Sequence, residues 1–327
     1  MNRRDFLLKS GAAASLALFA RGSLSAQSAT ATTPPVATPG APAPGGGAVQ
    51  MPTPVTTFTP LRRNVGLFTG RGGNIGWLVN SSAVVGVDTQ FPDTAALFLK
   101  NLPGRDGRSL DAVINTHHHG DHTGGNTTLR PSAKTIVAHA NVPALLQARA
   151  EADKRPLDPL TVPDATFTDT WRRDFGDETI RLNYFGPAHT KGDIVTHFEK
   201  ANVVHMGDLM FNRLYPVIDR PGGASIRAWV TLLEKVAADY PADAIYIFGH
   251  NNPKFAPTGT AADLLVFRDY LSALLAHVAA ELKAGKSRDE VLKLENLPGF
   301  PDFHAPVGRG NRLPMNLGVA YDELASA

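Results

Sequence analysis

The chain has 327 residues, enough for one large domain or two small ones, and it contains no cysteine, which excludes disulfides and thiolate metal ligands. The formal net charge is +2, but residues 1–26 hold Arg3, Arg4, Lys9 and Arg21 against Asp5, a net +3, so the rest carries −1. This near-neutral remainder predicts that nucleic acid is not a partner.

The N-terminus resembles a twin-arginine export signal. Arg3-Arg4 is followed by an apolar run, residues 11–20, and by small residues that end near Ala26. We expect residues 1–26 to be removed on export through the twin-arginine machinery, and we expect a periplasmic or otherwise exported protein. The apolar run is too short for a membrane span in the mature protein. Residues 27–56 are rich in Pro, Ala, Thr and Gly and predict a disordered linker.

Strands and helices alternate along the rest of the chain. In the first half, the patterns predict strands and helices in this order: strands 65–68, 75–79 and 83–88, helix 94–101, strand 110–115, a helix starting in 125–129, strand 135–138 and helix 142–152. In the second half they predict strands 166–169, 179–184, 194–198 and 203–206, helix 225–238, strand 244–248, helix 261–283, and a short helix with an extended cap in 287–327. The apolar stripe of helix 261–283 indicates core packing.

Metal-binding side chains are concentrated directly after strand 110–115, in the order His-x-His-x-Asp-His from His117 to His122. If the backbone stays extended, His117 and His119 lie on one face and His118 on the other. Gly120 then allows a turn that aims Asp121 and His122 at a second point. Imidazole and carboxylate donors suit zinc and similar divalent ions.

This motif resembles the signature of the metallo-β-lactamase-fold hydrolases, Thr-His-x-His-x-Asp-His after a strand. Three further blocks of that family occur in the family's order, over roughly residues 60 to 255: 186–193 with His189, 203–208 with Asp208, and 245–250 with His250. The resemblance implies an α/β fold, the four-layer αβ/βα sandwich, with a catalytic domain at 57–256 and a C-terminal helical extension at 257–327.

Carried over position by position, the resemblance implies two Zn²⁺ ions, or another divalent metal. His117, His119 and His189 would bind the first ion, Asp121, His122 and His250 the second, and Asp208 would bridge them. A hydroxide shared by two such ions is available near neutral pH as a nucleophile. Asp121 is the predicted catalytic residue, because it can orient this hydroxide and accept its proton.

The substrate is less determined than the chemistry. We expect a small carbonyl compound, an ester, lactone, thioester or amide, and a pocket wall formed by Phe211, Asn212, Arg213 and Tyr215. One alternative is a metallo-β-lactamase that hydrolyses β-lactam antibiotics, in which Arg213 would hold the carboxylate of the drug. An alternative of another class is a metal-carrying or maturation protein with little turnover.

Overall fold

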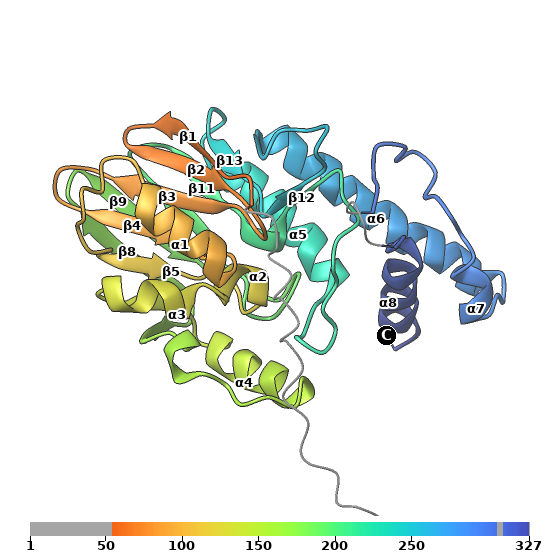
Figure 1. Cartoon of the computed structure of the whole chain (residues 1–327). Coiled ribbons are helices and arrows are strands. Elements are labelled where there is room, and N and C mark those ends of the chain that lie inside the picture. The colour runs from red at the N-terminus through yellow and green to blue at the C-terminus, as the bar shows by residue number, and fades with distance from the viewer. Residues whose placement is uncertain (1–53, 306–309, 327) are drawn as a thin grey trace, which may run out of the picture. The chain divides into compact units, whose positions relative to one another are not determined.

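The structure is a computed structural model that describes residues 54–305 and 310–326 (Figure 1). The predicted export signal, and all but the last three residues of the predicted linker, lie outside the described residues. Among the described helices, none combines the length and the apolar character that a membrane crossing needs.

Seven strands form the first sheet, in the spatial order of their sequence, with β1 to β4 antiparallel and β4 to β7 parallel. Their bounds are β1 Thr57–Arg62, β2 Val65–Thr69, β3 Ile75–Val79, β4 Val84–Val87, β5 Ala112–Ile114, β6 Ile136–His139 and β7 Ala165–Phe167. The helices that follow the parallel strands are α1 Pro92–Asn101, α2 Gly120–Thr123, α3 Asn126–Leu129 and α4 Val142–Ala152.

Six strands form the second sheet, in the order β15-β13-β11-β10-β9-β8. Their bounds are β8 Thr170–Phe175, β9 Glu178–Asn183, β10 Val195–Phe198, β11 Val203–His205, β13 Ile245–Ile247 and β15 Thr258–Gly259. A separate two-stranded sheet pairs β12 Phe211–Asn212 with β14 His250–Asn251 in parallel. The later helices are α5 Ile226–Asp239, α6 Ala261–Lys283, α7 Arg288–Val291 and α8 Leu313–Ala325.

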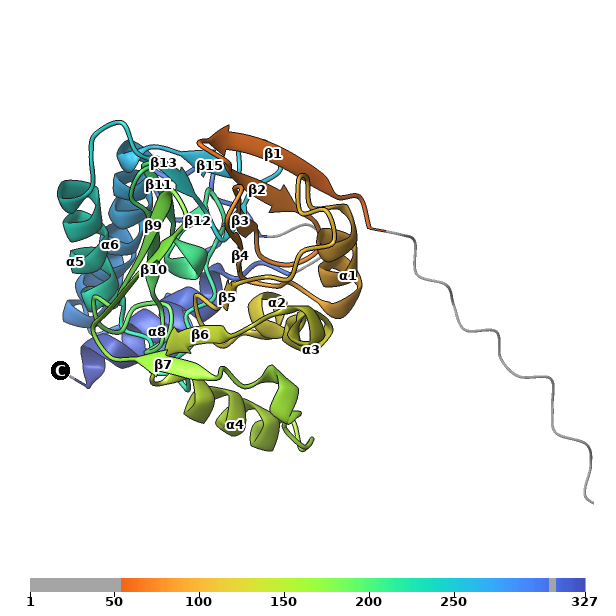
Figure 2. The ribbon, with the colours of Figure 1, turned by 90° about the vertical axis from the view of Figure 1, so that its left-hand side faces the viewer.

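The two sheets pack face to face, with helices on both outer faces (Figure 2). Apolar side chains from both sheets, such as Val85 and Ile114 from the first and Leu182 and Val203 from the second, share one buried cluster. A second cluster joins the first sheet to α1, and a third joins the second sheet to α5, α6 and α8. This is the predicted αβ/βα sandwich with C-terminal helices, because each sheet buries one face against the other and one against helices.

Most predicted elements are present within a few residues of their expected bounds, and α4 and α6 match to the residue. The extended cap predicted for 287–327 is wrong, because Leu313–Ala325 is a helix. Leu313, Leu317 and Ala320 have helical spacing and are buried, but Pro314 and Gly318 interrupt the sequence pattern. Strand β8 was also missed, because most of its residues are exposed and their alternation is weak.

Candidate metal centre

The His117–His122 motif lies where the chain leaves the buried strand β5 and enters α2. β5 is parallel to β4, with Ile114 opposite Val87, and His119 directly precedes the first residue of α2. The strand brings His117 into the interior, where it has no exposed surface, and the turn of α2 brings Asp121 and His122 around the same point. The predicted change of direction at Gly120 is thus present as the start of a helical turn.

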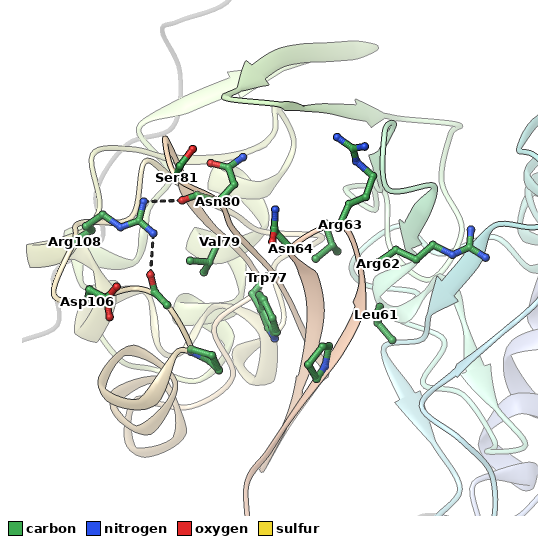
Figure 3. A pocket seen from close by; sticks show the side chains of 14 residues that line it. Leu61, Arg62, Arg63, Asn64, Trp77, Val79, Asn80, Ser81, Asp106 and Arg108 are labelled. Carbon is green, nitrogen blue, oxygen red and sulfur yellow. Dashed lines mark hydrogen bonds between the residues drawn. The ribbon is translucent and has the colours of Figure 1, made fainter.

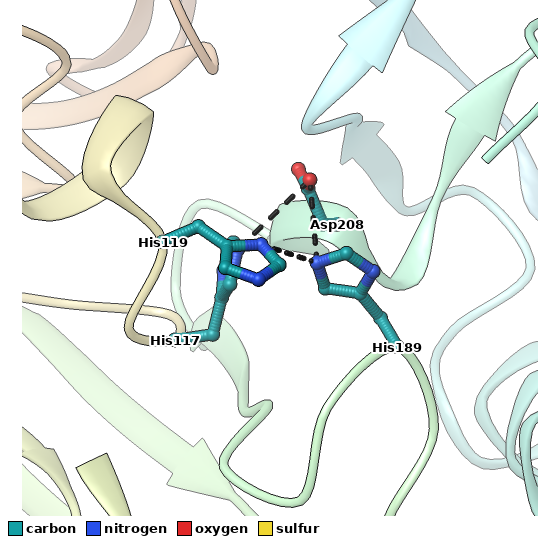
Figure 4. A group of neighbouring side chains, drawn as sticks. All are labelled: His117, His119, His189 and Asp208. Atoms are coloured by element: carbon teal, nitrogen blue, oxygen red, sulfur yellow. Dashed lines mark hydrogen bonds and ion pairs between the residues drawn. The ribbon is translucent and has the colours of Figure 1, made fainter. Parts of the chain in front are cut away.

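The three histidines predicted for the first metal meet at Asp208 (Figure 4). One nitrogen from each of His117, His119 and His189 and one oxygen of Asp208 all lie within 4.8 Å of one another. His119 Nδ1 is 2.9 Å from His189 Nε2, and Asp208 Oδ2 is 3.6 Å from the same nitrogen. His189 lies in the loop before β10, and Asp208 follows β11, so the second sheet supplies half of this cluster.

The residues predicted for the second metal meet at the other oxygen of Asp208. Asp208 Oδ1 lies 3.0 Å from His122 Nε2 and 3.3 Å from His250 Nε2. Asp121 Oδ2 is 3.2 Å from His250 Nε2, which completes a group of three side chains that could hold an ion. One carboxylate therefore presents an oxygen to each of two clusters, the arrangement that a bridging ligand needs.

A hydrogen-bond chain behind the site sets which nitrogens of His117 and His122 face inward. His122 Nδ1 is 2.7 Å from Asp88 Oδ2, and the carboxylate can only accept. Thr116 Oγ1 donates to Asp88 at 2.8 Å and is 3.0 Å from His117 Nδ1, so it accepts the proton of that nitrogen. His117 Nε2 is therefore left without a proton and is buried without a hydrogen-bond partner, and His122 directs its Nε2 toward Asp208.

The ring orientations of His189 and His119, the other two histidines of the first cluster, are also fixed by hydrogen bonds. His189 Nδ1 donates to the carbonyl oxygen of Val217 at 2.8 Å, and His119 Nε2 donates to Asp219 Oδ2 at 3.0 Å. The facing atoms, His189 Nε2 and His119 Nδ1, are consequently two lone pairs at 2.9 Å. Two such lone pairs repel each other unless a cation lies beside them, so this donor set fits a divalent metal ion.

The electrostatics of the metal-free site differ between the two clusters. Burial, together with the neighbouring His119, lowers the pKa of His189 to about 3, so this ring is neutral. Burial also lowers the pKa of His250, but Asp208 and Asp121 outweigh burial and raise it to about 9. Burial opposes ionisation of Asp208, yet the charges of His122 and His250 hold its pKa well below the usual range.

Two glycines lie so close to predicted ligands that a side chain at either position would clash with them. A Cβ atom on Gly73 would meet His122 Cε1 at 2.1 Å, and a Cβ atom on Gly249 would meet Asp208 Oδ1 at 2.2 Å. Gly73 also donates its backbone N–H to the carbonyl oxygen of Asp121. Glycine is therefore required at both positions, because any side chain would displace a predicted ligand.

The predicted substrate segment only partly reaches the metal centre. The Phe211 ring stacks on His250 with centroids 5.4 Å apart, so it forms a wall of the site. Arg213 pairs with Asp263 at 3.5 Å and lies over the ring of Phe255, so its charge is directed toward α6. Asn212 donates to the carbonyl oxygen of Ala256.

Tyr215, the fourth residue of that segment, is buried and packs against Tyr270 of α6, within the helical core. Its placement corrects the expectation that all four residues line a pocket. The spacing from Asp208 alone did not show that the chain turns away after β12. Val217 was not predicted, yet it is partly exposed and its carbonyl oxygen holds His189, which places it at the edge of the first cluster.

A hollow of about 760 Å³ lies elsewhere on the first sheet, and none of the predicted ligands lines it (Figure 3). Its Arg108 donates to the carbonyl oxygens of Asn80 and Gly104, and its Arg63 pairs with Asp177. These cations are already engaged, so the chemistry of the molecule is concentrated at the two histidine clusters.

The model of the metallo-beta-lactamase superfamily matches residues 68–250, more than half of the chain. The chain belongs to the metallo-β-lactamase superfamily. The predicted superfamily and its general chemistry, metal-dependent hydrolysis, are thereby confirmed. The matched range contains all seven predicted ligands and excludes α6 to α8.

Among the relatives, a hydroxyacylglutathione hydrolase from Gloeobacter violaceus is 35% identical over 105 residues, 32% of this chain and 36% of that protein. The chain thus matches about a third of that relative. A type 2 metallo-beta-lactamase from Bacteroides fragilis is 25% identical over 179 residues, 54% of this chain and 67% of that protein. A solved metallo-beta-lactamase from Pontibacter korlensis superposes with a TM-score of 0.54 at 16% identity, over 67% of this chain and 99% of that one, which shows the shared fold.

Asp88 was not predicted as a site residue, yet it is fully buried and contacts both His122 and Thr116. A signal for it was present. Asp88 directly follows β4, the strand that is parallel to β5, and the ends of parallel neighbours meet at one edge of a sheet.

Proposed function

We propose that this chain is an exported two-zinc hydrolase that cleaves a small carbonyl substrate, an ester, lactone, thioester or amide. The observation that carries the proposal is the position of Asp208, which presents one oxygen to each of two clusters of inward-facing imidazole nitrogens. Bound zinc ions would supply Lewis acidity and a water molecule of lowered pKa.

Asp121 is the residue that we assign to proton transfer. Its side chain is 31% exposed, against 4% for Asp208, so Asp121 faces the solvent side of the second cluster. Burial raises its pKa, but the charges of His122 and His250 more than compensate and hold the carboxyl ionised. An ionised carboxylate beside the nucleophile can accept a proton and return it to the leaving group.

The walls of the site favour a substrate with a small apolar acyl group. Phe211 covers His250, and the partly exposed Val217 lies beside His189. Arg213, the cation that a β-lactam carboxylate would need from this segment, is paired with Asp263. These contacts support a carbonyl substrate other than a β-lactam antibiotic, and the thioester class agrees with the name of the Gloeobacter relative.

The test is metal analysis of the mature protein together with a panel of aryl esters, lactones, acyl thioesters and nitrocefin. We expect two zinc ions per chain and hydrolysis of esters, lactones or thioesters that is lost with chelator and restored by zinc. His189→Ala should lose the first zinc ion and most turnover, whereas His277→Ala on α6, outside the clusters, should lose neither. Efficient nitrocefin hydrolysis would favour the lactamase, and two bound ions without any turnover would favour a metal carrier.

A further inference from the structure

The loop between β12 and α5 is bound to two of the three histidines of the first cluster. Residues 217–223 of this loop accept a hydrogen bond from His189 Nδ1 at the Val217 carbonyl oxygen, and they return one from the Asp219 N–H to the His189 carbonyl oxygen at 3.2 Å. The N–H of Lys191 donates to the carbonyl oxygen of Gly222. The loop and the His189 segment therefore hold each other along their backbones.

The side chain of Asp219 extends this connection to the His117–His122 motif. Its Oδ2 accepts the hydrogen bond from His119 Nε2, and its Oδ1 accepts one from the N–H of Gly222 at 2.9 Å. A Cβ atom on Gly222 would lie 2.1 Å from Oδ2, so glycine is needed for the carboxylate to sit there. The carboxylate is thus fixed by its own loop before it meets the imidazole.

We propose that Asp219 is a positioning residue for the first metal ion, acting through His119. A carboxylate can only accept, so it keeps the proton of His119 on Nε2 and leaves the Nδ1 lone pair for the ion. Because the same loop binds His189 through Val217, one short segment fixes the ring orientation of both histidines. This inference rests on the proposed metal site, and no motif of the sequence includes Asp219.

His118 suggests an alternative role for Asp219, as a ligand of a further metal ion, and the experiment must distinguish this role from positioning. Its Nε2 is 3.5 Å from the same oxygen of Asp219, and its Nδ1 is buried without a hydrogen-bond partner. His118, His119 and Asp219 could by spacing hold an ion of their own. That ion would need His119 Nε2 as a ligand, but this nitrogen carries the proton that Asp219 accepts while Nδ1 serves the first cluster, so we assign a positioning role instead.

The experiment measures the zinc affinity and stoichiometry of the full-length protein by chelator competition. Asp219→Asn and Asp219→Ala should weaken the binding of one of the two zinc ions by roughly 10- to 100-fold and leave the affinity for the other unchanged. Asp111→Asn is the matched control, because Asp111 is similarly exposed and also accepts a backbone N–H and one side-chain hydrogen bond. It should bind zinc as the wild type does.

Unfolding of the metal-free variants by urea shows whether lost affinity reflects a damaged fold. The proposal expects Asp219→Asn and Asp111→Asn to be similar in stability and different in zinc affinity. If the wild type binds two ions and Asp219→Asn binds both as tightly, Asp219 does not position His119. If the wild type binds three ions and His118→Gln binds two, Asp219 is itself a ligand. A wild type that binds no zinc would instead overturn the proposed function.

Discussion

His122 Nδ1 donates to Asp88 Oδ2 at 2.7 Å, and this one bond decides which nitrogen of His122 faces Asp208. Asp88→Asn would place an amide N–H opposite Nδ1 if its oxygen kept the backbone N–H of Thr116. The imidazole proton would then move to Nε2, the atom that must bind metal. We expect roughly 10- to 100-fold weaker binding of the second zinc ion, measured by chelator competition.

Asp193 supplies the matched control for that substitution. It is as buried as Asp88 and likewise accepts the backbone N–H and the hydroxyl of one threonine, Thr190, but it holds no histidine. Asp193→Asn should therefore leave the zinc affinity unchanged. Equal losses in the two variants would mean that burial of a carboxylate, and not its bond to His122, controls the site.

Gly73 tests the steric limit of the second cluster. Gly73→Ala places a methyl group 2.1 Å from His122 Cε1, so either the ring or the turn at residues 70–74 must move. We expect loss of the second zinc ion and of most turnover, with a small change in the unfolding free energy. Gly86→Ala should change neither, because its new methyl group would sit 3.5 Å from Phe98, an ordinary contact. Full zinc content in Gly73→Ala would show that the turn adapts.

Asp121→Asn separates metal binding from turnover. The variant keeps an oxygen that can reach the second cluster, and Asp208, His122 and His250 still surround the ion. It removes the ionised carboxylate that accepts a proton. We expect most of the zinc to be retained and kcat to fall by roughly 10²- to 10⁴-fold. A variant with wild-type kcat would remove Asp121 from the mechanism.

The metal-ligating residues were easier to predict than the residues that orient them by hydrogen bonds. The positions of His117, His119 and His122 follow from a short motif after a strand, because ligand spacing along the chain is local. Asp219 lies 100 residues from the histidine it touches, in a turn whose sequence resembles any surface loop. Only the packing of the second sheet against the first brings the two together.

The C-terminal region shows the same limit for the fold. Helix α6 was predicted to the residue, because its apolar stripe is long and regular. Helix α8 was missed, because Pro314 and Gly318 look like breakers. Pro314 sits in the first turn, where its missing N–H costs no hydrogen bond, and Gly318 lets the guanidinium of Arg288 approach the helix.

The affinity of the two clusters for zinc should depend differently on pH. In the metal-free protein His250 has a pKa of about 9, and although burial lowers the pKa of His122, Asp208 and Asp88 raise it well above its usual range. Both rings are therefore protonated at pH 7, so an ion in the second cluster must displace two protons. His189, with a pKa of about 3, is already neutral, so an ion in the first cluster displaces none from it. Between pH 7 and pH 9 the second-cluster affinity should therefore rise by up to about 100-fold per pH unit, and the first-cluster affinity should stay nearly constant. His250→Ala and His189→Ala each retain one intact cluster, so chelator competition at pH 7, 8 and 9 measures the clusters one at a time. Equal slopes in the two variants would contradict this assignment of charges.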